Sequence, residues 1–387
     1  MKGLRFFRIF DNERCPCGSE LTFRNCCKGK SGELSKENKL PLEVQVMQMM
    51  KNSLQKYCLH PDQKNCKKPI KNAHALQNNK IISLLAGNER HVYTMSANQQ
   101  PRIEKNKVGV PEVIVEFKKT SANKATTSTC FCDRHDNIVF AAIEKGAPSF
   151  DKYNEEMKFV YAYKAFIFEY YKAQESFKIF QKSFKRCPLA FKNILMVMMY
   201  RMQQLDIEYF DSVKAHFDEE IMANTHNGVE TVVIEIPEQI KFACFAFIAP
   251  LCDLNGKKIK HTSNNKTHRL AITIFPENSR SYIILSCLKK ERAAYNDFFN
   301  QLKSERIDKI KYYFSLILPL YSENIVLSPE LWNQWDEDIK KTLVLYSNIS
   351  NHKVGEYATR IKMHLKNVSK NQGNFDYKLE MKFGLFK

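Results

Sequence analysis

The sequence predicts an α+β protein in which two small zinc-binding modules precede a larger domain of helices around a small antiparallel sheet. Three features of the 387 residues lead to this prediction. Four cysteines lie within a short N-terminal run, and a second group of cysteines and histidines occupies the centre of the first half. The rest of the chain alternates between helical and strand-like hydrophobic patterns. With 44% hydrophobic residues, the chain can bury a sizeable core.

The N-terminal cysteines are Cys15, Cys17, Cys26 and Cys27, which form the pattern C-x-C, eight residues, C-C. Four thiolates this close together can surround one tetrahedral zinc ion. Residues 1–31 are too short to bury a core, so the metal would supply most of the folding free energy of this knuckle. The alternative is a set of free or disulfide-bonded cysteines.

This run resembles the SEC-C zinc motif, which is best known from the tail of a bacterial protein-export ATPase. The matching positions are Cys15-Pro16-Cys17-Gly18-Ser19, Phe23-Arg24 and Cys26-Cys27, whereas Glu20 and Leu21 depart from the family pattern. The resemblance covers residues 13–30 and implies a bound zinc ion and a small adaptor that contacts a protein partner.

A second zinc set is predicted further along the chain. Its four ligands are Cys58, Cys66, Cys132 and His135, with the last two at the expected start of a helix. Cys130 and His60 are competing ligands. Residues 32–54 are predicted to form a linker and a helix, and residues 55–150 a treble-clef or ββα-metal-like zinc module.

The central module resembles the HNH nuclease group, whose core is a β-hairpin followed by a helix that binds a catalytic metal. Ala73-His74 matches the end of the first strand, and Phe131-Cys132-Asp133-Arg134-His135-Asp136-Asn137 matches the start of the helix. The resemblance implies that His74 is the general base, that Asp136 binds Mg²⁺ or Mn²⁺, and that Asn137 orients the phosphate or the metal. Asn78 and Asn79 are alternatives to Asn137.

The chain departs from the HNH pattern at three points. Ala73 stands where many members have a metal-binding Asp, and the 56 residues between His74 and Phe131 form an unusually long insert. His135 cannot bind a structural zinc and a catalytic metal at once. If His135 took the catalytic metal, Cys130 would have to complete the zinc site.

The net charge of +18 is concentrated at the start of the chain. Residues 1–149 hold 25 Lys and Arg against 14 Asp and Glu, a net charge of +11, and the remaining residues hold 35 against 28, a net charge of +7. This density of positive charge predicts a polyanionic partner, most simply nucleic acid. The alternative is a solvated basic face with no partner. The basic residues predicted to contact phosphates are Lys67, Lys68, Lys71 and Arg134.

Residues 151–387 carry the pattern of an α+β domain. Helices are expected over 155–184, 189–222, 290–303, 306–320, 329–346 and 353–366, and strands over 229–236, 241–249, 269–275 and 282–287. The last two strands flank the polar run of residues 276–281, which predicts a hairpin turn. In the first part of the chain, a helix is expected over 42–57, a strand over 108–117 and a helical segment over 138–143.

The longest apolar run, residues 242–252, is about half a membrane span, and the N-terminal ten residues are too charged for a secretory signal. We therefore expect a cytoplasmic protein that does not insert into membranes. The leading prediction is a metal-dependent nucleic-acid endonuclease of HNH-like type with DNA as the expected substrate, for which bacterial defence would be a role by analogy. The alternative is a non-catalytic, zinc-dependent adaptor for nucleic acid or protein.

Overall fold

The computed structural model describes residues 7–30, 48, 52, 55–67, 69–95, 102–105, 111–144, 146–186, 188–260, 262–263, 266–349, 351–370 and 383–386. Most of the helix expected over residues 42–57 falls outside these ranges, as does Lys68.

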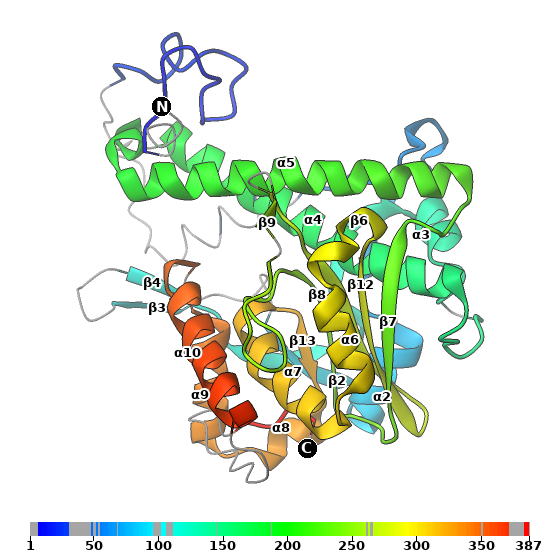
Figure 1. The fold of residues 1–387 in the computed structure, drawn as a ribbon. Coiled ribbons are helices and arrows are strands. Elements are labelled where there is room, and N and C mark those ends of the chain that lie inside the picture. The colour runs from blue at the N-terminus through cyan, green and yellow to red at the C-terminus, as the bar shows by residue number, and fades with distance from the viewer. Residues whose placement is uncertain are drawn as a thin grey trace.

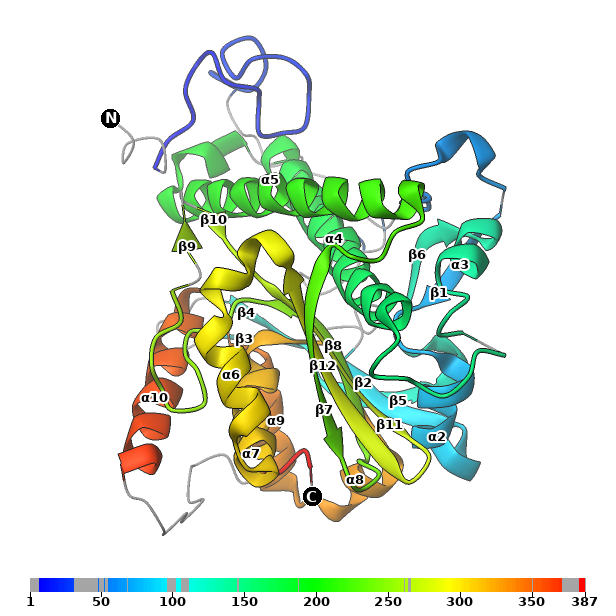
Figure 2. The same ribbon diagram turned by 45° about the vertical axis from the view of Figure 1, so that its right-hand side comes forward.

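A seven-stranded antiparallel sheet forms the centre of the molecule (Figures 1 and 2). Its strands lie in the order β5 (Phe117–Ser121), β2 (His91–Met95), β13 (Ile325–Leu327), β8 (Phe242–Ile248), β11 (Leu270–Glu277), β12 (Arg280–Leu288) and β7 (Val229–Ile236). Every residue of β8 is buried because helices cover both faces of the sheet. Side chains alternate between the faces, so Phe245 and Phe247 pack into one core and Cys244 and Ala246 into the other.

Two long helices, α4 (Glu155–Arg186) and α5 (Ile194–Ala223), cover one face of the sheet. Their aromatic stripes provide the contacts: Phe166 of α4 packs against Phe217 of α5 and against Phe247 of β8. The other face is covered by α6 (Asn296–Ser304) and α7 (Ile307–Tyr321), as Figure 2 shows. The remaining helices on that side are α8 (Pro329–Gln334), α9 (Glu337–Ser347) and α10 (Asn351–Lys370).

The C-terminal elements follow the predicted order with shifted ends. The hairpin of β11 and β12 turns at Asn278, as expected from the polar run there. The helix expected over residues 290–303 starts only at Asn296, after the short helical turn η7 (Lys289–Ala294). The helix expected over 329–346 is divided into α8 and α9, because Asp336 caps the start of α9 by accepting a hydrogen bond from the Ile339 N–H.

The sheet is larger than predicted, because three of its strands were not expected in it. β13 pairs with β8 on one side and with β2 on the other, which joins β2 and β5 to the sheet of the C-terminal part. The long insert after His74 therefore supplies strands to this sheet. Strands from both sides of residue 150, where the central module is expected to end, therefore belong to one sheet.

The central segment contains a ββα unit that encloses this insert. β1 (Ile70–His74) pairs antiparallel with β6 (Thr127–Cys132), and α3 (Asp133–Val139) follows directly. The strand expected over 108–117 is instead β4 (Pro111–Ile114), paired with β3 (Arg102–Lys105), followed by the start of β5. The helical segment expected over 138–143 is the end of α3 and the turns after it.

The remaining elements of the described residues are short. They are α2 (Ser83–Ala86), the strands β9 (Thr262–Ser263) and β10 (Lys266–Thr267), and the helical turns η2 (Gln63–Asn65), η3 (Asn78–Ile82), η4 (Gly87–Glu89), η5 (Ala122–Lys124) and η6 (Pro188–Lys192). Within the described ranges, none of the helices has the length and apolar character needed to cross a bilayer.

Candidate metal centres

The first candidate metal centre is formed by Cys15, Cys17, Cys26 and Cys27, whose sulfur atoms all lie within 4.8 Å of one another. The Sγ atoms of Cys17 and Cys26 are 3.5 Å apart, and those of Cys26 and Cys27 are 3.7 Å apart. The structure thus brings together the four cysteines that the spacing singled out.

Backbone hydrogen bonds hold the two cysteine pairs of this centre together. The Cys15 N–H donates to the Leu21 carbonyl at 2.9 Å, and the Phe23 N–H donates to the Glu13 carbonyl at 2.8 Å. Gly18 turns the chain between the pairs with a φ of +81°, a left-handed conformation that favours glycine. The Ser19 hydroxyl donates to the Cys26 sulfur at 3.0 Å.

The pKa values of two thiols of this centre shift in opposite directions. Burial raises the pKa of Cys15 to about 11. At Cys17 burial acts in the same direction, but hydrogen bonds from the Ser19 side chain and backbone outweigh it and lower the pKa to about 6. A metal that binds here must therefore displace protons from the more buried thiols, which makes binding depend on pH.

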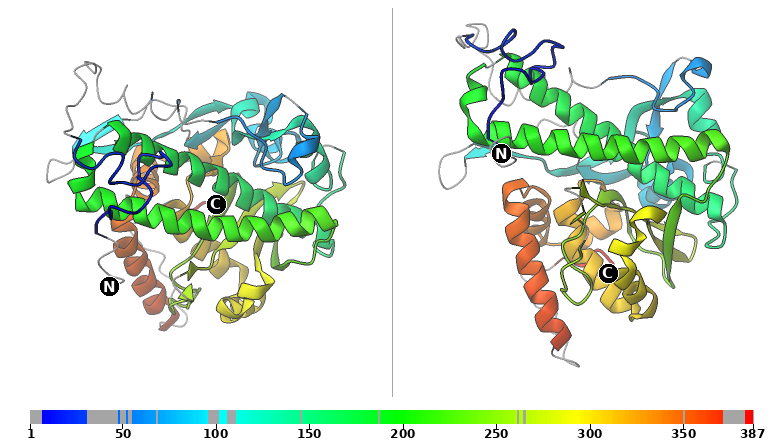
Figure 3. Two further views of the ribbon diagram at one scale, coloured as in Figure 1. Left: turned by 90° about the horizontal axis from the view of Figure 1, so that it is seen from above. Right: turned by 45° about the horizontal axis from the view of Figure 1, so that its top comes forward.

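The knuckle is docked on the end of the α4–α5 pair (Figures 1 and 3). Phe23 packs against Phe191 of η6 with ring centroids 4.8 Å apart, and Arg201 of α5 forms an ion pair with Glu13. A Cβ atom on Gly18 would lie 3.2 Å from the side chain of Gln181 on α4. The small core of the knuckle is thus completed by a side chain from the main body.

The second candidate metal centre is formed by Cys58, Cys66, Cys132 and His135, and its ligand atoms also lie within 4.8 Å of one another. The Nδ1 atom of His135 is 3.4 Å from the sulfur of Cys58, 3.5 Å from that of Cys66 and 3.4 Å from that of Cys132. His135 therefore faces all three sulfurs with one ring nitrogen.

Three segments supply these ligands. Cys58 lies where residues 57–59 run beside β6, with the Leu59 N–H donating to the Cys130 carbonyl at 2.9 Å. Cys66 follows η2, while Cys132 ends β6 and His135 occupies the first turn of α3. Backbone groups of Lys67 and His135 hydrogen-bond to the Cys132 sulfur, and these bonds contribute to lowering the pKa of this thiol against the effect of burial.

Both sets fit a zinc ion. Zinc binds sulfur at about 2.3 Å and nitrogen at about 2.0 Å in a tetrahedral arrangement. In that geometry two sulfur ligands lie about 3.8 Å apart, and a sulfur and a nitrogen ligand lie about 3.5 Å apart. The observed separations of 3.5 and 3.7 Å in the first centre, and of 3.4 to 3.5 Å in the second, agree with this geometry. Thiolate and imidazole are also the ligands that zinc prefers.

The two competing ligands lie outside the second set. Cys130 is completely buried, and its side chain is not among the four that converge. Burial is also the main cause that raises the pKa of this thiol well above its usual range. His60 stacks on His135 with ring centroids 3.8 Å apart, and its Nδ1 accepts a hydrogen bond from the Asp62 N–H. Burial and the neighbouring His135 lower the pKa of His60 to about 4.

The predicted catalytic residues His74 and Asp136 lie near the same two charged groups, Glu144 and Lys164. Lys164 of α4 is almost completely buried and forms an ion pair with Glu144, which follows α3. Burial, followed by the Lys164 charge, lowers the pKa of His74, whereas burial raises the pKa of Asp136. The Nε2 atom of His74 is buried and has no hydrogen-bond partner among the described residues.

These groups do not fit a catalytic Mg²⁺ or Mn²⁺ ion as they stand. Such ions take several oxygen ligands that converge on one point. In the part of the chain that the structure describes, His74, Asp136 and Glu144 do not form a third group of converging ligands beside the two cysteine-rich ones. The nearby cation is the ammonium group of Lys164, which already neutralises Glu144.

The remaining predicted residues lie on the surface of the central module. Asn137 is exposed on α3 and donates a hydrogen bond to Asp133, so it does not join His74. Lys71 forms an ion pair with Asp133. Lys67 and Arg134 are exposed and have no ion-pair partner among the described residues.

Lys164 and Glu144 were not predicted from the sequence. One signal was available, since Lys164 is the single charge in the apolar run of residues 159–168. A charge at the centre of a buried helical stripe requires a partner, but the sequence does not identify which acidic residue provides it.

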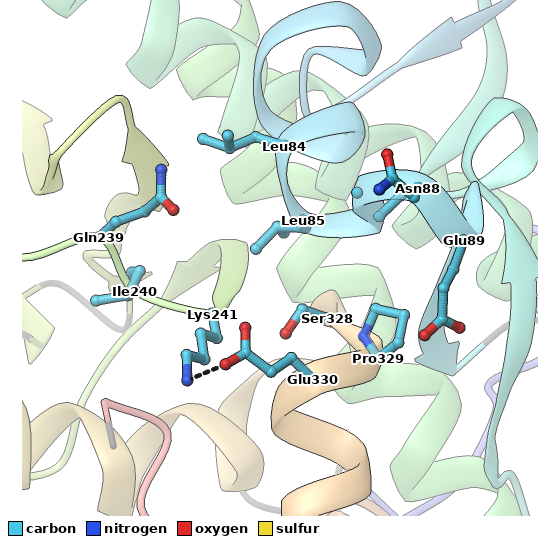
Figure 4. A pocket seen from close by; sticks show the side chains of 12 residues that line it. Leu84, Leu85, Asn88, Glu89, Gln239, Ile240, Lys241, Ser328, Pro329 and Glu330 are labelled. Carbon is cyan, nitrogen blue, oxygen red and sulfur yellow. Dashed lines mark ion pairs between the residues drawn. The ribbon is translucent and has the colours of Figure 1, made fainter.

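A pocket of about 310 Å³ contains none of the predicted site residues (Figure 4). It is lined by residues 84–89, 239–241 and 328–330. Lys241 and Glu330 close one side of it with an ion pair of 2.6 Å, so these charges satisfy each other.

Comparison with known proteins identifies one segment. Residues 12–28 match the family model of the SEC-C motif, which covers the first metal centre and the knuckle around it. The chain has no match among curated proteins or solved structures. The comparisons therefore support a SEC-C metal-binding knuckle and provide no support for an HNH nuclease module.

Proposed function

We propose that the protein is a non-catalytic, zinc-dependent adaptor that binds nucleic acid. The observation that carries this proposal is the ligand count of the two centres. Each set has four protein ligands, which complete a tetrahedral shell around zinc. A catalytic zinc usually has three protein ligands and one open position for water or substrate. Zinc in these centres would therefore stabilise structure.

The basic surface beside the second centre is the proposed contact with nucleic acid. Lys67 follows Cys66, Lys64 lies two residues before it, and Arg134 precedes His135, so all three lie within two residues of ligands whose donor atoms are 3.5 Å apart. Their side chains are exposed and have no ion-pair partner among the described residues. Zinc would hold these charges in a fixed arrangement that can neutralise neighbouring phosphates.

The proposal is tested by fluorescence anisotropy of duplex DNA and of single-stranded RNA with the full-length protein and a Lys67→Glu/Arg134→Glu variant. The variant is expected to bind at least 10-fold more weakly, because removal of each phosphate-binding side chain reduces the salt slope by about 0.9 for duplex DNA. Lys290→Glu is the matched control, since Lys290 is also exposed and lies outside the central module.

Either of two results would contradict the proposal. The wild-type protein could bind neither nucleic acid at low salt. Alternatively, the Lys67→Glu/Arg134→Glu variant could have the same affinity and salt slope as the Lys290→Glu control. The first result would point to a protein partner for the adaptor, and the second would place the nucleic-acid contact elsewhere.

The ββα order supports a second candidate function, which is phosphodiester cleavage. His74 ends the first strand, Asp136 lies on the helix, and the His74 Nε2 atom has no partner among the described residues. A general base needs an unprotonated nitrogen within reach of the substrate, but His74 Nε2 is buried, so the site would have to open before substrate could reach it.

Cleavage of supercoiled plasmid and of RNA, with Mg²⁺ or Mn²⁺ present or omitted, tests this second candidate. Cleavage that disappears in His74→Ala and persists in His226→Ala, another half-buried histidine, would establish it. Intact substrates under all conditions would exclude it and leave the adaptor.

A further inference from the structure

His60 and His135 lie with their rings parallel at the second metal centre. The ring centroids are 3.8 Å apart and the planes differ by 13°. His60 is 8% exposed, and His135 is 2% exposed. We propose that His60 is a positioning residue whose ring, stacked on His135, holds the His135 Nδ1 atom toward the three cysteine sulfurs. This inference rests on the zinc binding assumed in the proposed function.

Among the described residues, the His135 ring lacks the hydrogen bond that usually orients a metal-binding histidine, so another contact must fix the ring. A histidine that binds a metal through one nitrogen commonly donates its other N–H to a carboxylate or carbonyl, which fixes the ring orientation. Within the described ranges, Nδ1 is the His135 ring atom that meets the three sulfurs, and no hydrogen bond is found for Nε2. Contact with the face of His60 is the specific ring contact that remains.

The position of His60 is fixed from its own side. The Asp62 N–H donates to His60 Nδ1 at 3.1 Å, which orients the ring and places its proton on Nε2. The Gln63 side-chain amide donates to the Cys58 carbonyl at 2.9 Å and also to the His60 carbonyl, so the backbone around His60 is held as well. His60 Nδ1 is therefore occupied by a backbone donor and is not available as a fifth ligand.

Two substitutions distinguish whether His60 acts by stacking on His135 or by binding zinc. His60→Ala removes the stacked ring, whereas His60→Phe keeps an aromatic ring that can stack but cannot bind metal. Both are made in the full-length chain with Cys26→Ser and Cys27→Ser, which leaves two of the four thiols of the first centre, so that the second centre dominates metal binding. Zinc affinity is measured by competition with a chromophoric chelator, and ligand geometry by the visible absorption of the Co²⁺-loaded protein.

We expect His60→Ala to weaken zinc binding about 10- to 100-fold, which is the usual effect of removing a group that orients a ligand. Its Co²⁺ absorption bands should shift or lose intensity, because the His135 nitrogen no longer holds one direction. His60→Phe should restore both affinity and spectrum to near the parent values. His91→Ala, a buried histidine of β2 away from the centre, should leave both unchanged.

Three outcomes would overturn the inference. In the first, His60→Ala keeps the affinity and the Co²⁺ spectrum of the parent. In the second, His60→Phe is as impaired as His60→Ala, which would assign the effect to the imidazole nitrogens. In the third, the unsubstituted chain binds one zinc ion and the Cys26→Ser/Cys27→Ser chain binds none. That result would reject the second zinc centre itself and with it the proposed function, so it is distinguishable from the other two.

Discussion

Phe23 of the SEC-C knuckle packs against Phe191 of the main body, with ring centroids 4.8 Å apart. Phe191 in turn stacks on Phe184 of α4, so the knuckle is joined to the core through a continuous row of aromatic rings. The cysteine-rich segment is thus packed against the α4–α5 pair, and its four cysteines and this contact stabilise it together.

Replacing Phe191 with Ala should release the knuckle without removing its metal. The change deletes the body's contribution to the small core. Because Phe191 is half-buried, the cost is expected at the lower end of the range of about 1.5–3 kcal/mol for full burial of a Phe side chain. Amide hydrogen exchange over residues 12–28 should become about 10-fold faster while the zinc content stays constant. Phe386→Ala, which removes a comparable aromatic contact with Phe242, is the control. Unchanged exchange in the knuckle would show that this contact does not hold it.

The buried ion pair between Lys164 and Glu144 should stabilise the fold. In Lys164→Met, Glu144 loses its partner, but its side chain is 31% exposed and can reach water, so a loss of about 1–3 kcal/mol is expected. Urea unfolding of Lys164→Met, Glu144→Gln and the double variant measures the coupling between them. Additive losses in the double variant would show that the two charges do not support each other.

His74 should make stability depend on pH. Its folded-state pKa is lowered, mainly by burial, relative to the ordinary value of about 6.5. The unfolded chain therefore binds a proton more readily, so the contribution of His74 is complete above about pH 6.5 and is lost as the pH falls toward the folded-state value. Urea unfolding between pH 7.5 and 5.5 should show a steeper loss for the wild type than for His74→Phe. Parallel pH profiles would contradict the assignment.

The sequence predicted those elements whose residue patterns lie within one short segment of the chain. β7 matches the expected strand over residues 229–236 because its residues alternate between buried and half-buried positions. The hairpin of β11 and β12 followed from the turn residues between them. Both cysteine-rich sets also assembled as expected, since ligand chemistry and spacing are visible in the sequence itself.

Features that depend on distant partners were not predicted. β13 is only three residues long, and β2 lies inside the long insert, so neither carries enough periodicity to show that they pair with each other. The pair of Lys164 and Glu144 joins a helix to a turn after α3, and no spacing rule connects them. His60 was considered as a ligand, because composition cannot distinguish a ring that binds metal from one that stacks on the ligand.

The most direct test for two zinc centres is the zinc content of the purified protein, measured by mass spectrometry of the metal in parallel with protein concentration. Two centres predict two zinc ions per chain, one in Cys26→Ser, one in Cys66→Ser and none in the double variant. Each substitution removes a ligand from one centre only. Fewer than two zinc ions in the wild type, or two in either single variant, would contradict this prediction.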